Sequence, residues 1–194
     1  MNDSLLPMKI ITKALVCVVV CAAASAARGQ VVYSGKMQEP RLSVGALGSV
    51  FQPDYNGTGV PAEATNRLYG YGTYVDWNIR HWVQIEGEAR WLRFNAKENI
   101  REDNYLVGPR VPLPRYWKLQ PYAKALFGYG RMNFQYNYAY GRFANVALGG
   151  GVDIPLNKRF TLRAVNFEYQ MWPNWINGTL KPYGGDIGIS YRIF

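Results

Sequence analysis

The side chains best suited to catalysis are scarce in this sequence. It has one histidine, His81, in the short segment "IRH", and two cysteines, Cys17 and Cys21, both among the first thirty residues. A histidine-dependent nucleophilic site needs its base within hydrogen-bond reach of a nucleophile, and His81 is a lone histidine in a turn-like segment. The Cys and His residues also lack the spacing of metal ligands. We therefore expect a solvated turn histidine, no enzymatic activity, and no metal or other cofactor.

The chemistry that the sequence does support is ion pairing between side chains at alternate positions. In "WVQIEGEARW", residues 82–91, one face carries Glu86, Glu88 and Arg90, and the other face is apolar. Across the chain, the polar faces of such segments carry five basic and six acidic side chains, so their charges nearly cancel. Charges buried inside a protein must be paired. The predicted ion-pair network consists of Asp76, Glu86, Glu88, Arg90, Arg110, Lys124, Asp153, Arg163, Glu168, Asp186 and Arg192.

The charged positions belong to segments whose polarity alternates with period two, which is typical of β-strands. The alternation is interrupted between Arg163 and Phe167, which predicts a β-bulge or twist around Val165. The eight predicted strands cover residues 41–51, 67–78, 82–91, 103–111, 118–130, 145–154, 159–171 and 186–194.

The connections between these segments alternate in length. Long polar stretches such as "QPDYNGTGVPAEATN" take turns with short ones such as "IRH" and "PLNKR". Eight antiparallel strands with long loops at one end and short turns at the other form an up-and-down barrel, and closure leaves no exposed sheet edge. We predict an all-β protein with this fold.

Glycine and aromatic residues indicate which face of the barrel points inward. Nine of the 20 glycines lie on the polar face, where they make room for large side chains inside a narrow barrel. Apart from Arg67 and Asp103 at the ends of their segments, the apolar face carries no charge in the second to sixth and eighth segments. Tyr and Trp near strand ends suit a lipid–water boundary. We therefore predict a transmembrane barrel with a polar lumen, encircled by an aromatic girdle of Tyr69, Tyr71, Trp77, Trp82, Trp91, Trp117 and Tyr129.

From residue 41 to 194 the sequence resembles the small eight-stranded outer-membrane β-barrel proteins of Gram-negative bacteria, the OmpA-like and OmpX-like barrels. Members of that family end in a strand of the type Gly-x-Ser-Tyr-Arg-Phe, and this chain ends "GISYRIF". The resemblance implies that Gly188, Tyr191, Ile193 and Phe194 form an insertion signal for the barrel-assembly machinery. Ile193 occupies the place of the expected Phe, and the periplasmic peptidoglycan-binding domain of the OmpA family has no counterpart.

The N-terminal residues have the pattern of a secretory signal peptide. Lys9 and Lys13 precede an uncharged run, Ala14 to Ala27, that is shorter than the roughly 20 residues of a spanning helix. Cleavage after Ala26 or Gly29 and a start at Met1 or Met8 are all compatible with this pattern. We expect a cleaved signal peptide at 1–29, an N-terminal periplasmic stretch at 30–40 and the barrel at 41–194.

The expected function is a structural or surface-binding, adhesion-type role for a barrel whose lumen is plugged by ion pairs. A narrow pore for water or small ions and a soluble lipocalin-like binder are the alternatives. Tyr136, Tyr138 and Tyr140, at alternate positions of one long loop, form a candidate surface patch. The surplus of basic residues at both barrel ends suits outer-membrane lipid and lipopolysaccharide. We expect a monomer in the outer membrane that binds no nucleic acid.

Overall fold

The described part of the chain forms a closed antiparallel barrel. The computed structural model describes residues 41–53, 67–95, 101–133, 140–175 and 178–193. Each long strand pairs with its neighbours in the sequence, and the ring closes because β1 also pairs with β9. The bounds are β1 (Arg41–Gln52), β2 (Leu68–Arg80), β3 (Val83–Phe94), β4 (Arg101–Pro112), β5 (Gln120–Asn133), β6 (Tyr140–Pro155), β7 (Phe160–Trp175), β8 (Gly178–Leu180) and β9 (Tyr183–Arg192). The prediction of an eight-stranded antiparallel up-and-down barrel is confirmed.

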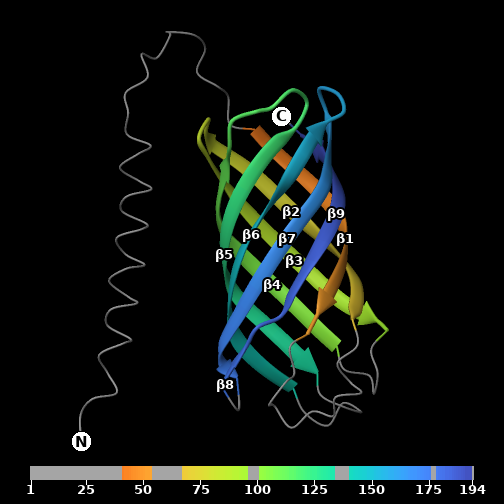
Figure 1. Ribbon diagram of the computed structural model, residues 1–194, viewed down its shortest axis with the longest axis vertical. Coiled ribbons are helices and arrows are strands. Elements are labelled where there is room, and N and C mark those ends of the chain that lie inside the picture. Colours follow the sequence, from red (N-terminus) through yellow and green to blue (C-terminus); the bar gives the residue numbers. More distant parts are fainter. Residues whose placement is uncertain (1–40, 54–66, 96–100, 134–139, 176–177, 194) are drawn as a thin grey trace, which may run out of the picture. The chain divides into compact units, whose positions relative to one another are not determined.

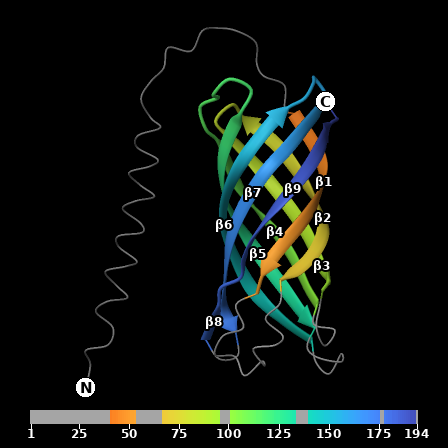
Figure 2. The ribbon, with the colours of Figure 1, turned by 45° about the vertical axis from the view of Figure 1, so that its right-hand side comes forward.

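The two ends of the barrel differ in their connections. Figures 1 and 2 show the eight long strands tilted around a common axis. The β2–β3, β4–β5 and β6–β7 connections lie at one end, the turn end, with the end of β9 (Figure 1). The short strand β8 pairs only with β7 and lies at the opposite end, the loop end (Figure 1).

Side chains alternate between the lumen and the outer surface, as the period-two pattern requires. In β2, Leu68, Tyr74 and Asp76 are buried, whereas Tyr71 and Trp77 are exposed. The other strands of the described barrel continue this alternation, so the polar face lines the lumen and the apolar face lies outside. The lipocalin-like alternative, which requires an apolar lining, is therefore excluded.

Glycines on the inner face admit large side chains. A Cβ atom on Gly45 would lie only 2.8 Å from the hydroxyl oxygen of Tyr74, and one on Gly130 would lie 2.8 Å from Cζ3 of Trp172. On the outer face of the same strand as Gly45, a Cβ atom on Gly48 would meet nothing within 4 Å. The inner glycines thus provide space that the outer glycine does not need to provide.

Strand β7 contains the predicted irregularity. Its register shifts against β9 between Arg163 and Asn166, and its register against β6 shifts beside Val165. The extra residue changes the phase of the strand, so that Arg163, Asn166 and Glu168 are all buried. This bulge lets one strand bring both a cation and a carboxylate into the lumen.

Several strands are longer than the sequence pattern predicted. β6 begins at Tyr140, β7 extends to Trp175 and β9 begins at Tyr183. Backbone pairing does not require alternating polarity, so the ladders continue beyond the amphipathic segments.

Within the described residues, no helix is long and apolar enough to cross a membrane.

Candidate functional site

Lys124 on β5 is the central cation of the lumen. Its Nζ atom lies 2.8 Å from Glu86 Oε1, 2.8 Å from Glu88 Oε2 and 3.2 Å from Glu168 Oε2. The lysine side chain is completely buried. An ammonium group carries three donor hydrogens, so three acceptors match its capacity. Two strands, β3 and β7, therefore direct carboxylates at one cation from β5.

Arg90 on β3 extends this cluster toward the loop end. It contacts Glu88, and its Nη1 atom lies 3.0 Å from Glu168 Oε1. Its Nη2 atom lies 3.3 Å from Asp186 Oδ2 on β9. The guanidinium also lies 4.1 Å from the ring centroid of Phe51, a cation–π contact. Phe51 connects β1 to the network, to which that strand supplies no charged side chain.

Arg163 and Arg110 extend the cluster toward the turn end. The Nη2 atom of Arg163 lies 2.7 Å from Glu86 Oε2 and 3.6 Å from Asp76 Oδ2. Arg110 has its Nη1 atom 2.6 Å from Asp76 Oδ2 and also pairs with Asp153. Asp76 therefore lies between two guanidinium groups.

Two tyrosine rings lie against these guanidinium groups. Arg163 lies 3.7 Å from the ring centroid of Tyr74, and Arg110 lies 3.7 Å from that of Tyr122. The Tyr122 hydroxyl donates a hydrogen bond of 3.0 Å to Asn166 Oδ1. The rings fill space beside the cations and exclude water from the ion pairs.

Ten of the eleven residues predicted for the network meet in these contacts, and they come from seven strands. The exception is Arg192. Its Nη1 atom donates a hydrogen bond of 2.9 Å to the carbonyl oxygen of Lys158, and no acidic side chain of the described residues pairs with it. Arg192 is the last residue of β9, so it lies at the rim. The ion-pair network therefore joins four basic and six acidic side chains, and Arg192 of the predicted set is not among them.

Sequence reasoning missed a further polar layer of the lumen, which consists of amide side chains, the Trp172 indole and the Glu102 carboxyl group. Asn145 Nδ2 donates to Asn104 Oδ1 at 2.7 Å and to Gln170 Oε1 at 2.9 Å. The indole Nε1 of Trp172 donates to Gln170 Oε1 at 3.0 Å. Asn104 Nδ2 donates to Glu102 Oε1 at 3.0 Å. Asn104, Asn145 and Gln170 lie within the predicted segments, but only charged side chains were assigned to the network. Continuing the inward phase of β4 and β7 by one residue toward the loop end would have found Glu102 and Trp172.

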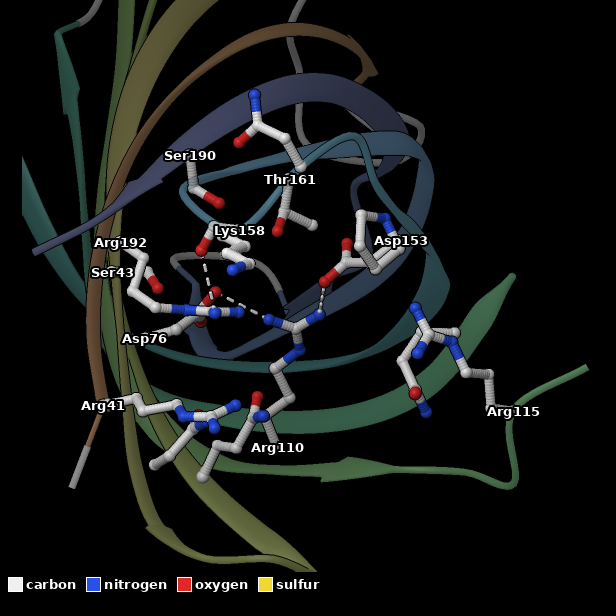
Figure 3. Close-up of a pocket in the computed structure, with 15 residues that line it drawn as sticks. Arg41, Ser43, Asp76, Arg110, Arg115, Asp153, Lys158, Thr161, Ser190 and Arg192 are labelled. Carbon is white, nitrogen blue, oxygen red and sulfur yellow. Dashed lines mark hydrogen bonds and ion pairs between the residues drawn. The ribbon is translucent and has the colours of Figure 1, made fainter. Parts of the chain in front are cut away.

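Beyond Arg110, the lumen opens at the turn end into a cavity of about 580 Å³ (Figure 3). Figure 3 shows Asp76 and Asp153 bound to Arg110 on one side of this cavity. We call this cavity the vestibule, and the residues around it include Arg41, Arg115, Lys158, Thr161, Ser190 and Arg192. Sequence reasoning did not predict it, because its walls come from strand ends and turns far apart in the chain.

The outer surface carries a row of aromatic rings near the loop end. Ring centroids are 5.7 Å apart for Tyr71 and Trp91, 6.3 Å apart for Trp91 and Tyr105, and 5.1 Å apart for Tyr105 and Tyr129. The Trp91 indole also donates to the Tyr105 hydroxyl at 3.1 Å. The structure thus brings three predicted girdle residues together with Tyr105, which was not predicted. The predicted residue Tyr69 is exposed on the same side of β2 as Tyr71.

The remaining predicted girdle residues lie toward the turn end. Trp77 is exposed near the end of β2, Trp82 is exposed in the following turn, and Trp117 is exposed between β4 and β5. Aromatic rings therefore occur on the outer surface toward both ends of the barrel.

The last strand separates the residues of the predicted insertion signal. Gly188 pairs with Leu47 on the inner face, whereas Tyr191 and Ile193 are exposed outside. The Tyr191 ring lies 5.2 Å from that of Phe160 in an edge-on arrangement. Phe194 lies outside the described residues.

The predicted tyrosine patch falls largely outside the described residues, and the lone histidine lies in a turn. Tyr136 and Tyr138 lie outside the described residues, and only the backbone of Tyr140 is described, at the start of β6. His81 is exposed in the turn between β2 and β3. Among the described residues, no three His, Cys, Asp or Glu side chains are grouped to hold a metal ion.

Comparison with known proteins places this geometry in a family context. The family model described as "Outer membrane protein beta-barrel domain" matches residues 14–192. The crystal structure of Neisserial surface protein A has 8% sequence identity and a TM-score of 0.64, with 77% of this chain and 96% of that chain covered. The N-terminal β-barrel domain of Pseudomonas aeruginosa OprF has 10% identity and a TM-score of 0.53, with 80% and 100% covered. The search of curated proteins gave no significant match.

Replacement of Lys124 tests the energetic role of the network. Lys124→Met would leave the carboxylates of Glu86, Glu88 and Glu168 without their shared cation. Breaking a buried ion pair by removing one partner costs about 3–5 kcal/mol. We expect a loss of that size in the free energy of unfolding, measured by urea denaturation of the folded barrel in detergent micelles.

The matched control is Lys118→Met, because Lys118 is exposed between β4 and β5. We expect it to change the free energy of unfolding by less than about 0.5 kcal/mol. Adding Glu88→Gln to Lys124→Met removes one uncompensated charge and should recover part of the loss. Equal effects of the two lysine replacements would contradict an energetic role for the network.

Proposed function

Because this chain belongs to the outer membrane protein β-barrel domain family, we propose that it is a monomeric, non-enzymatic protein of the bacterial outer membrane with a closed lumen. Its loop end serves a structural or surface-binding role. We assign the short turns to the periplasmic side and the longer loops to the cell surface, because outer-membrane barrels usually have this orientation. The loops themselves provide the contact area for a surface partner.

The observation that carries this proposal is the filling of the central part of the lumen by paired side chains. An eight-stranded barrel is only just wide enough for side chains to fill its interior. Arg90, Arg163 and Glu168 are each completely buried, and each contacts partners from other strands. Such a cross-section favours a plug over a water-filled path, so it supports the closed barrel more than a narrow pore.

The aromatic side chains on the loop side of the ion-pair network also favour a closed lumen. Trp172 is completely buried, and its ring centroid lies 6.0 Å from that of Phe143. Gly130 on β5 leaves the space that the indole occupies. An ion entering from the loop end would have to displace this indole before it reached Arg90.

A row of charged residues on the outer surface supports a lipid partner. Arg93 Nη2 lies 2.8 Å from Asp103 Oδ1. In the backbone register of the neighbouring strands, Asp103 lies opposite Arg131, and Arg131 lies opposite Arg142. Asp103 lies two residues before Tyr105 on β4, and Arg131 lies two residues after Tyr129 on β5. Both charged residues are therefore on the loop side of the aromatic row. Belts of Tyr and Trp in membrane proteins lie at the headgroup level, so we assign the lipid headgroups to this level of the barrel. Two facing arginines would gain from a phosphate placed between them, so we propose lipopolysaccharide phosphates as a partner.

Ion conductance tests the closed lumen. We expect the purified protein to give no large, steady conductance in planar lipid bilayers. The double variant Arg90→Ala with Glu168→Ala removes one cation and one anion from the lumen, leaves the net charge unchanged, and should raise the conductance by opening a water path. The control, Arg93→Ala with Asp103→Ala, removes an outer ion pair and should behave like the unmodified protein. Steady conductance of the unmodified barrel would refute the closed lumen and favour the narrow pore.

Binding of lipopolysaccharide tests the outer arginine row. We expect Arg131→Gln with Arg142→Gln to weaken binding of lipopolysaccharide micelles to the detergent-solubilised barrel by at least about tenfold, because the loss of a single charge-assisted hydrogen bond already has an effect of that size. The control, Arg80→Gln with Lys118→Gln, removes the same charge at the turn end and should change binding less than twofold. If both variants lose affinity equally, only the overall charge matters and the arginine row is not a site.

A further inference from the structure

The vestibule is a basic cavity whose cations are only partly used by the lumen network. Five basic and two acidic side chains line it. Both acids, Asp76 and Asp153, already pair with Arg110. Among the residues that the structure describes, no acidic side chain pairs with Arg41, Arg115 or Lys158. The vestibule therefore has a surplus of positive charge that faces its open space.

These cations come from four separate parts of the fold and converge on one cavity. Arg41 begins β1 and Arg192 ends β9, whereas Arg115 and Lys158 lie in the β4–β5 and β6–β7 connections. Figure 3 shows all four around the open space beside Arg110. Arg192 uses one N–H on the carbonyl of Lys158, and a guanidinium has five such donors. Donors therefore remain for a ligand in the cavity.

Neutral donors and a closed floor complete the vestibule. The hydroxyl groups of Ser43, Thr161 and Ser190 line it, and hydroxyls donate to oxyanions. The Arg110 ion pairs and the Tyr122 ring beneath them separate it from the central network. Its volume of about 580 Å³ lies in the range of small-molecule sites. The vestibule is thus a blind pocket that can hold a ligand, not the entrance to a passage.

We propose that the vestibule binds a small soluble polyphosphate or phosphorylated anion from the periplasmic side. Arginine forks bind phosphate oxygens in pairs, and several arginines around one cavity favour a ligand with more than one phosphate group. The vestibule residues Ser43 and Ser190 belong to the inward-facing rows of β1 and β9, not to the lipid-facing surface. A soluble anion can enter this mouth along the barrel axis, whereas a membrane lipid would have to bend its headgroup around the rim.

The test is titration of the folded barrel with pyrophosphate, using calorimetry in nanodiscs of zwitterionic lipid at constant ionic strength. We expect saturable binding with one site per barrel, and weaker binding of inorganic phosphate. The variant Arg41→Gln, Arg115→Gln and Lys158→Gln should weaken pyrophosphate binding at least tenfold, because it removes charge-assisted hydrogen bonds. The control, Arg80→Gln, Lys118→Gln and Arg159→Gln, removes the same charge at the same end from residues outside the vestibule lining and should change affinity less than twofold.

Three results would overturn the proposal. The first is the absence of saturable pyrophosphate binding to the unmodified barrel. The second is an equal loss of affinity in both triple variants, which would indicate a diffuse basic surface. The third is a tenfold loss of pyrophosphate affinity in nanodiscs that contain phosphatidylglycerol, which would assign these cations to lipid headgroups. Thermal unfolding of each variant in the same nanodiscs shows whether it is folded.

Discussion

The structure depends on a narrow interior in which the central cations and carboxylates must be paired with one another. Eight strands enclose little more space than their own side chains need, so the lumen cannot hydrate a buried ion. Lys124 is bound by three carboxylates from two other strands, and Arg90 by three from three strands, including its own. Each ion pair therefore also fixes the register of a strand in the barrel. A slip of one residue would move these charged side chains to the outer face, where they would contact lipid.

The surroundings of the network follow from the same constraint. Gly45 and Gly130 leave space for the rings of Tyr74 and Trp172, and Tyr74 in turn covers the guanidinium of Arg163. The outer surface can then be apolar, with aromatic rings toward both ends. The two proposed binding sites therefore lie at the ends of the barrel. One is the charged row near the loop end, and the other is the basic vestibule at the turn end. A closed barrel is in this sense a rigid support for its ends.

The sequence predicts the fold and the charged side chains that face the lumen, because a period of two residues assigns every side chain to one face of a strand. It could even predict the bulge near Val165 from the lost phase. It could not predict that Arg192 lies at the rim, since alternation gives the face but not the depth along a tilted strand. The vestibule could not be predicted either. Its residues Arg41, Arg115 and Lys158 are far apart in the sequence, and they line one cavity only because the sheet closes into a barrel.

The most direct test of the closed, ion-paired lumen is hydrogen exchange of the arginine side chains, measured by NMR on the barrel in lipid nanodiscs. Buried N–H groups that are held in ion pairs exchange with water only when the surrounding structure opens. We expect the guanidinium protons of Arg90 and Arg163 to exchange at least about 100-fold more slowly than those of the exposed Arg115. Comparable exchange rates for the three arginines would contradict a closed lumen, because they would mean that water reaches its centre.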